Sequence, residues 1–173
     1  MIQQLKLLWL KWYQMKKEIK EKVQHLIKET RVMTFAVSNN NIPWSSPVYF
    51  VCHDNGFYFF SNENSKHIKY AQGSTKVSAS IFQDSDKIDE IFGLQMSGKL
   101  EKISSPNLYF KIVKKYVAKF NFLRQVFGSQ ILDSKNFFLE KFKSHLYCFY
   151  PDQIFLSDNS NKSDKRSKID LSF

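Results

Sequence analysis

Three consecutive polar residues, Ser65, Lys66 and His67, have side chains that could bind an anion. Ser65 stands where a helix N-cap is expected, and Lys66 and His67 fall in the first turn of that helix. Backbone N–H groups at a helix start, a hydroxyl and a lysine together suit a phosphate group. The simpler interpretation is that Ser65 only caps the helix while Lys66 and His67 stay in solvent, and the sequence leaves both open.

The neighbouring residues predict elements that would hold this segment in place. Residues 57–60 are four consecutive aromatics, which favours a strand, and residues 61–64 form a polar turn. Gly73 marks the end of the short helix, and residues 77–81 alternate in the manner of a strand. The candidate anion site therefore lies in the connection between two strands.

Other catalytic and binding patterns do not occur in the sequence. We find no Ser-His-Asp arrangement, paired carboxylates or metal-ligand spacing, and the glycine-rich fingerprints of Rossmann and P-loop nucleotide sites are missing. The two cysteines, Cys52 and Cys148, are far apart and fall in predicted strands. We therefore expect two reduced, buried thiols in a cytoplasmic protein rather than a disulfide or a metal site.

Length and composition indicate one globular domain with a negatively charged partner. The chain has 173 residues, of which 43% are hydrophobic and 16% aromatic, which is enough for a sizeable core. Its net charge of +10 favours anionic partners such as phosphorylated cofactors, nucleic acid or lipid headgroups, without choosing among them. No apolar run is long enough to predict a transmembrane segment.

We expect three parts along the chain. Residues 1–30 predict an amphipathic helix packed on a barrel, because apolar residues recur at spacings of three and four between basic ones. A basic helix with two tryptophans could instead lie on a membrane surface or on a partner subunit. Residues 31–158 form the barrel domain, with inserted helices over 106–127 and 133–143, and residues 159–173 form a flexible basic tail.

Short strands at hairpin spacing fill the predicted barrel. Residues 44–53 predict a strand that contains Pro47, which implies a sheet edge or a bulge, and an Asp-Asn-Gly hairpin turn follows it. Residues 91–103 predict a long strand in which Gly93 and Gly98 mark bends or bulges.

Residues 145–150 and 153–157 predict the last two strands, joined by a Pro-Asp turn. The elements thus run as a helix, five strands with one small inserted helix, two helices and two strands. This order favours a mainly β (α+β) fold, a six- to seven-stranded antiparallel split β-barrel with flanking helices.

Residues 31–82 resemble the flavin-binding split barrel of the pyridoxamine 5'-phosphate oxidase-like superfamily. The shared features are two strands, a hairpin, an aromatic strand and a Ser-basic-basic segment that opens a helix. Residues 91–103 resemble that superfamily's strand with a glutamine followed by a small residue and glycine. Residues 146–159 are similar to the close of a small bacterial subgroup, so the resemblance covers about residues 20–160.

The resemblance implies a homodimer with FMN in a groove between the subunits. The flavin would supply redox chemistry, which makes the protein a candidate oxidoreductase of unknown substrate. The family's cofactor-binding positions correspond to Ser46, Pro47, Val48, Tyr49, Phe60, Ser61, Ser65, Lys66, His67 and Gln95. The Ser-basic-basic segment would bind the phosphate, and a charged His67 would add a second cation beside Lys66.

Some positions depart from the oxidases of this family. Ser46 stands where they place a phosphate-binding arginine, and Val113 replaces an arginine one turn after Tyr109, which matches a substrate tyrosine. The Arg-x-His pair that those enzymes use on their substrate has no counterpart in residues 158–173. We therefore expect no true pyridoxamine phosphate oxidase activity.

Two other classes of function remain open. A non-catalytic dimer of the same barrel could bind haem or a deazaflavin, and the imidazole candidates for haem are His25, His53, His67 and His145. The hypothesis that the basic surface binds nucleic acid or a membrane is supported by the net charge alone, because the sequence contains no motif of interleaved aromatic and basic residues. The resemblance favours FMN, and we expect no nucleic acid.

Overall fold

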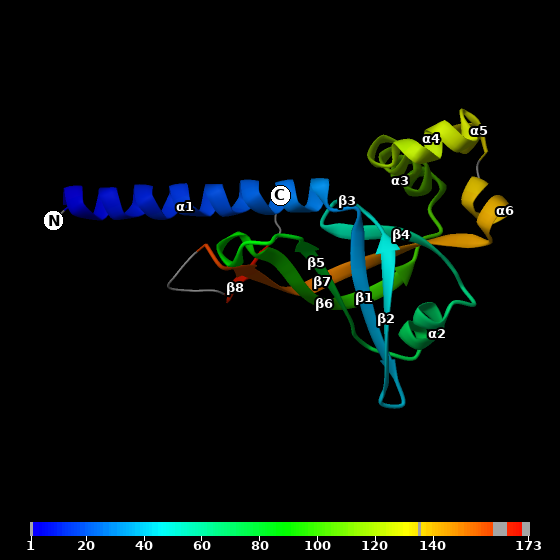
Figure 1. Cartoon of the computed structure of the whole chain (residues 1–173), viewed down its shortest axis with the longest axis horizontal. Helices are drawn as coiled ribbons and strands as arrows, with labels where there is room; N and C mark the ends of the chain where they lie inside the picture. The colour runs from blue at the N-terminus through cyan, green and yellow to red at the C-terminus, as the bar shows by residue number, and fades with distance from the viewer. Residues whose placement is uncertain (1, 135, 161–165, 171–173) are drawn as a thin grey trace.

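The computed structural model describes residues 2–134, 136–160 and 166–170. Within them, one antiparallel sheet of eight strands runs in the order β2-β1-β5-β6-β7-β4-β3, with β8 also paired to β7 (Figure 1). The strands are β1 (Val32–Asn39), β2 (Ile42–Tyr49), β3 (Val51–His53), β4 (Gly56–Asn62), β5 (Val77–Gln83), β6 (Phe92–Lys102), β7 (Ser144–Asp158) and β8 (Arg166–Ile169).

The helices flank this sheet, so the structure confirms the predicted antiparallel split barrel with flanking helices, with eight strands where six to seven were expected (Figure 1). They are α1 (Ile2–Glu29), α2 (Lys66–Gln72), the 3-10 turn η1 (Ile88–Glu90), α3 (Pro106–Lys119), α4 (Asn121–Phe127), α5 (Gln130–Asp133) and α6 (Phe137–Phe142). Helix α2 lies on one side of the sheet, and α3 to α6 gather at one end of the molecule.

The sheet curls because its first and last strands, β2 and β3, belong to one continuous segment of the chain. Strand β2 pairs with β1 and strand β3 pairs with β4, yet only Phe50 separates β2 from β3. The single strand predicted over 44–53 is thus divided at Phe50, whose side chain is fully buried and whose N–H donates to the carbonyl of Arg31 (3.2 Å). This bend turns the segment from one neighbour to the other, so the two ends of the strand order meet.

The main core fills the inner face of the curled sheet. Alternate residues of β1, β4 and β7, such as Phe35, Phe59 and Phe149, are fully buried there. The last turns of α1 add Val23 and Leu26 to the same core. Each such side chain stabilises the fold by about 1.5–3 kcal/mol when it leaves water.

A second core joins the inserted helices to β4 and β7. Phe60 of β4 stacks on Phe138 of α6 with ring centroids 3.7 Å apart. The two inserted helices predicted from the sequence are four shorter ones, because the chain turns at Phe120 and again at Gly128, where φ is +58°. Glycine adopts this φ at little cost, whereas other residues are strained there.

Strand β6 pairs irregularly where Gly98 predicted a bend or bulge, but the extra residue of the bulge is Asp152 of β7. The pairing of β6 with β7 shifts register between Ser97 and Gly98, and a Cβ atom at Gly98 would lie 2.1 Å from the carbonyl oxygen of Tyr150. Pro151 pairs with Gly98, precedes the extra residue and lies inside β7. The two strands predicted on either side of that proline are therefore one continuous strand.

The two ends of the chain add features that the sequence did not predict. Residues 159–173 are predicted to be a flexible tail, but residues 166–169 form β8 and pair with residues 154–157 of β7, while 161–165 and 171–173 lie outside the described residues. The edge of β7 beyond β4 offers free N–H and C=O groups, which explains this pairing. Helix α1 packs on the barrel through its C-terminal third, and its N-terminal half extends past the sheet (Figure 1).

None of the helices in the described part of the chain is both long and apolar enough to cross a membrane.

Candidate functional site

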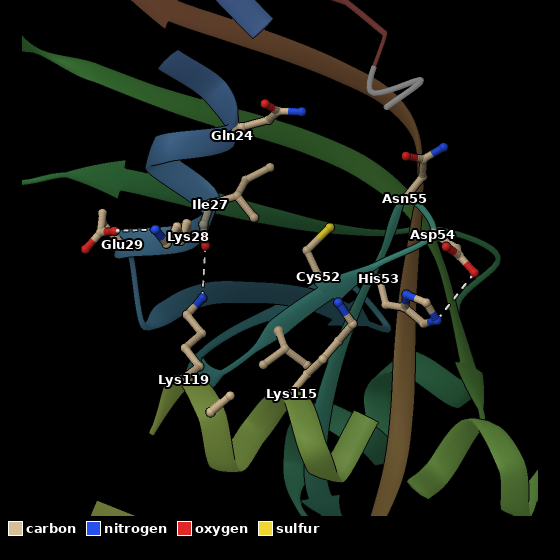
Figure 2. A pocket seen from close by; sticks show the side chains of 12 residues that line it. Gln24, Ile27, Lys28, Glu29, Cys52, His53, Asp54, Asn55, Lys115 and Lys119 are labelled. Carbon is tan, nitrogen blue, oxygen red and sulfur yellow. Dashed lines mark hydrogen bonds and ion pairs between the residues drawn. The ribbon is translucent and has the colours of Figure 1, made fainter. Parts of the chain in front are cut away.

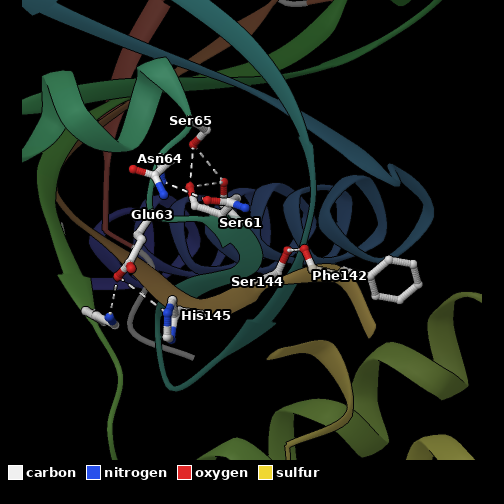
Figure 3. Close-up of polar contacts among 9 residues, drawn as sticks. Ser61, Glu63, Asn64, Ser65, Phe142, Ser144 and His145 are labelled. Carbon is white, nitrogen blue, oxygen red and sulfur yellow. Dashed lines mark hydrogen bonds and ion pairs between the residues drawn. The ribbon is translucent and has the colours of Figure 1, made fainter. Parts of the chain in front are cut away.

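The connection from β4 to α2 forms a compact polar cluster (Figure 3). Ser61, near the end of β4, is 7% exposed, and its Oγ lies 3.1 Å from Ser65 Oγ and 2.8 Å from His67 Nε2. Ser65 Oγ donates to the carbonyl of Asn62 (2.7 Å), while Asn62 Oδ1 accepts from the N–H of Asn64 (2.8 Å). The Ser65 side chain therefore holds the turn and makes no capping bond to the helix, although α2 starts where the sequence predicts.

Glu63, the carboxylate of this turn, faces away from α2. Its Oε2 accepts from Lys102 Nζ (3.2 Å) and lies 3.4 Å from His145 Nε2 (Figure 3). The bond to Lys102 holds the pKa of the Glu63 carboxyl below its usual range. Glu63 is thus paired on the side of β6 and β7 and does not neutralise the lysine at the start of α2.

Lys66 is positioned by aromatic rings rather than by a carboxylate. Its Nζ lies 4.1 Å from the centroid of the Trp44 ring and 5.3 Å from that of Tyr70. The Trp44 indole N–H donates to Ser46 Oγ (3.0 Å) within β2, and the ring fixed in this way meets Lys66 in the first turn of α2. No carboxylate among the described residues pairs with Lys66, and a cation–π contact orients an ammonium group without neutralising it.

His67 is an internal residue of this structure rather than a second exposed cation. Its half-buried ring lies beside Phe35 and Phe59, with centroids 6.3 and 6.4 Å away, and its Nε2 is bonded to Ser61. Burial lowers the pKa of His67, because charge is costly away from water. The neutral imidazole supports the turn, and Lys66 supplies the positive charge of the cluster.

Strand β2 presents the predicted cofactor residues on two opposite faces. Ser46 and Val48 face α2 and the core, whereas Pro47 and Tyr49 face outward, as alternation along a strand requires. β2 also ends the strand order, so its edge away from β1 has no strand partner in the described part of the sheet. Pro43 and Pro47 have no N–H, and the Tyr49 carbonyl accepts from the Tyr116 hydroxyl. The edge therefore offers a ligand mainly the backbone groups of Ser45 and the carbonyl of Pro47.

Gln95 lies on the outer face of the sheet, on the same row as Pro47. The register places Pro47 opposite Thr34, Thr34 opposite Ser80 and Ser80 opposite Gln95. Three strand spacings separate Pro47 from Gln95 by roughly 14 Å. Within one chain, the structure therefore does not bring Gln95 to the polar cluster around Lys66.

Phe60 and Tyr109 also lie apart from the polar cluster, in the second core. The Phe60 ring stacks on Phe138, and the Tyr109 ring meets Phe60 edge-on with centroids 5.7 Å apart. The Tyr109 hydroxyl accepts from the N–H of Phe138 (3.4 Å), and Val113 is buried one turn further along α3. Both positions that match substrate residues in the oxidases thus support the inserted helices.

Trp44 is the residue of the site that the sequence analysis missed. It lies two residues before Ser46, so alternation along a strand puts both side chains on the face that α2 covers. An aromatic residue at that spacing from Ser46 is a signal that could have identified it.

A separate cavity of about 680 Å³ lies between the end of α1, β3 and α3 (Figure 2). Lys119 Nζ donates there to the carbonyl of Ile27 (2.9 Å) and lies 4.0 Å from the Phe50 ring centroid. Burial lowers the pKa of Lys119 to about 8 and raises the pKa of Cys52 to about 11. Lys119 therefore ties α3 to the C-terminal end of α1, while the Cys52 thiol stays protonated.

Comparison with known proteins identifies relatives of this chain. Residues 19–143 match the family model described as pyridoxamine 5'-phosphate oxidase. UPF0306 protein PM1958 from Pasteurella multocida (strain Pm70) is 24% identical over 87 residues, which cover 49% of this chain and 58% of that protein. The matched stretch thus spans less than two thirds of that relative.

Solved structures share the fold at low sequence identity. HutZ, the heme storage protein from Vibrio cholerae, is 14% identical with a TM-score of 0.60, and the match covers 80% of this chain and 94% of that one. A FAD-binding protein from Mesorhizobium loti is 14% identical with a TM-score of 0.55, over 76% of this chain and 88% of that one. These likenesses show the fold alone and leave the ligand open.

Proposed function

Because the chain belongs to the pyridoxamine 5'-phosphate oxidase family, we propose that it is an FMN-binding oxidoreductase that works as a homodimer. The FMN phosphate would lie near Lys66 and Ser46, and the isoalloxazine ring along the free edge of β2. Pro47 and Tyr49 would border the ring on the outer face of that strand. Gln95 would approach the ring from the second copy, because it is distant from Lys66 within one chain.

The observation that carries this proposal is the exposed, unneutralised charge of Lys66. Trp44 holds the ammonium group, and Trp44 is itself fixed to Ser46, so a phosphate here would meet a positioned cation beside a hydroxyl. Helix α2 has only seven residues, and its dipole therefore adds little to the side chains. The net charge of +10 also favours a dianionic ligand.

FMN would supply the redox chemistry, and the residues of this chain would bind and orient it. The backbone groups of Ser45 and the carbonyl of Pro47, at the edge of β2, can pair with the polar side of the ring. The substrate would differ from pyridoxamine phosphate, because Tyr109 is engaged with Phe138 and the buried Val113 supplies no cation. Both cysteines are free thiols, which suits a reducing compartment such as the cytoplasm.

Lys66→Ala should weaken FMN binding by roughly 10- to 150-fold, because a charge-assisted bond to phosphate contributes about 1.5–3 kcal/mol. Riboflavin, which has no phosphate, should lose much less affinity. Lys69→Ala, an exposed position on the same helix, should leave both affinities unchanged. Quenching of flavin fluorescence measures the affinity of the wild type and both variants for each flavin. Equal losses of affinity for FMN and riboflavin in Lys66→Ala would mean that Lys66 does not bind the phosphate.

Haem is a second candidate ligand, because the heme storage protein HutZ shares this fold. The four histidines lie on four different elements or their ends: His25, His53, His67 and His145. Absorbance titrations of the purified protein with FMN, FAD and haem separate the candidates. A Soret band from bound haem, with no uptake of either flavin, would replace the FMN proposal with a haem-binding one.

A further inference from the structure

Among the side chains of α1 that the structure describes, those that pack in the main core of the barrel begin at Ile19 (Figure 1). The helix has 28 residues and is about 40 Å long, at a rise of 1.5 Å per residue. Met15, Ile19 and Val23 are spaced by four and share one face of the helix. Along that face Val23 is 1% exposed, Ile19 is half-buried and Met15 is 49% exposed, so the packed face continues past the edge of the barrel.

The N-terminal half of α1 exposes large apolar side chains. Trp9 is 57% exposed, Leu10 52% and Tyr13 54%. Trp9 and Tyr13 stack on each other with ring centroids 5.5 Å apart, a contact made within the helix itself. Exposed apolar groups of this size, gathered on one segment, mark a surface that binds a partner.

A segment slightly longer than this half of the helix, residues 2–17, is strongly basic. Residues 2–17 contain four lysines and no aspartate or glutamate, and the first acidic residue is Glu18. A second copy of this chain also carries a net charge of +10, so charge opposes docking of this segment on another copy. An anionic lipid surface offers the opposite charge together with an apolar layer beneath it.

We propose that the N-terminal half of α1 is an anchor that binds the surface of an anionic membrane. The helix would lie in the plane of the surface, with Trp9 and Tyr13 among the headgroups and the lysines near lipid phosphates. Tryptophan and tyrosine suit this depth because each has an apolar body and a polar tip. The anchor does not depend on FMN binding, and its tests involve no flavin.

Flotation of the full chain with lipid vesicles tests the anchor. The protein should bind vesicles of phosphatidylcholine mixed with phosphatidylglycerol, bind pure phosphatidylcholine far more weakly, and dissociate as salt is raised. Lys6→Gln combined with Lys17→Gln should weaken binding about 25-fold, since each lysine near an anionic surface contributes about fivefold. Trp9→Gln combined with Tyr13→Gln should weaken it at least about tenfold, because the apolar contact is lost.

Two matched controls carry the same kinds of change elsewhere on the molecule. Lys111→Gln combined with Lys141→Gln removes two exposed charges from the helices at the other end, and Ile88→Gln removes a side chain that is 76% exposed (Figure 1). Neither control should alter vesicle binding. Equal losses in the controls, or no binding of the wild type to anionic vesicles, would overturn the proposal. The proposal would also be overturned if the Trp9→Gln, Tyr13→Gln variant changed its mass in solution but still bound vesicles. That result would show that the N-terminal half of α1 contacts a second copy of the chain.

Discussion

His67 and Lys66 are neighbours in the chain with opposite surroundings. Successive residues of a helix point about 100° apart, so the first turn of α2 directs them to different places. Lys66 extends over Trp44 at the surface, whereas His67 turns inward to Ser61. One residue is thus available to a ligand, and the other serves the fold.

The free energy of unfolding should decrease as the pH falls below about 6.5, in part through His67. Burial lowers the pKa of His67 in the folded state, so the unfolded state binds more protons at acidic pH. Stability is therefore lost between the ordinary histidine pKa and the lower folded value. His67→Gln keeps a hydrogen-bonding partner for Ser61 but cannot titrate, so its urea midpoint should depend less on pH in this window.

The control for this experiment is His25→Gln, an exposed position on α1 that should reproduce the wild-type pH profile. Identical profiles for the wild type and His67→Gln would mean that folding does not shift the pKa of His67, so that its ring still gains a proton near pH 6.5 in the folded protein. In that case FMN affinity should also fall as the pH rises towards 8, because a second cation near the phosphate would be lost.

For the individual residues around Lys66, the sequence identifies the segment that forms the candidate site but not the contacts that its side chains make. Ser65, Lys66 and His67 stand out because capping and basic residues at a helix start are local signals. That Trp44 covers Lys66, and that Ser61 meets His67, depends on which elements pack against α2. No pattern within one segment contains that information.

The bend between β2 and β3 depends on a helix far away in the sequence. Tyr116 of α3 is buried, and its hydroxyl donates to the carbonyl of Tyr49 and lies 3.3 Å from that of Tyr58. The Tyr49 carbonyl lies where the segment changes its pairing partner, and Tyr58 is the β4 residue that pairs with Val51 just after the bend. The inserted helices therefore stabilise the bend that sets the direction of the free edge of β2.

Gly98→Ala should lower the free energy of unfolding by roughly 1–3 kcal/mol. The added methyl group would overlap the carbonyl of Tyr150, so the backbones of β6 and β7 would have to separate. Gly73→Ala is the matched control, because its nearest atoms are 3.8 Å away, and it should be neutral or stabilise by up to about 1 kcal/mol. Urea unfolding followed by tryptophan fluorescence measures both. An unchanged midpoint for Gly98→Ala would mean that the bulge is more open than the structure shows.

Local periodicity identifies most strands and helices of this chain but does not locate their breaks. The apolar stripe of α3 continues through Phe120, where no glycine or proline marks a turn. The helix ends there in contact with a distant strand, since the Phe120 ring packs against Tyr49 of β2. The reverse occurs at Pro151, where β7 continues through the proline because the strand bulges at the next residue, Asp152.

The whole molecule leaves an apolar surface on the outer face of the sheet. Tyr49 is 52% exposed, Phe82 55% and Phe155 40%, and Gln95 is paired directly opposite Phe155. Gly93 leaves room for the Phe82 ring, because a Cβ atom there would lie 2.6 Å from Phe82 Cδ2. The solvent-facing side of an antiparallel sheet is normally polar, so this surface fits the second copy that the proposed FMN groove requires.

Light scattering at micromolar concentration should give twice the mass of one chain. Phe82→Ser combined with Phe155→Ser should shift the protein to monomer, since each aromatic side chain at the centre of an interface contributes about 2 kcal/mol or more. FMN affinity should fall in the same variant, because the groove would lose Gln95 of the second copy. Val126→Ser, at a position that is 69% exposed on α4 at the other end of the molecule, should change neither quantity (Figure 1). A monomeric wild type that binds FMN fully would show that one chain is sufficient and that Gln95 does not contact the cofactor.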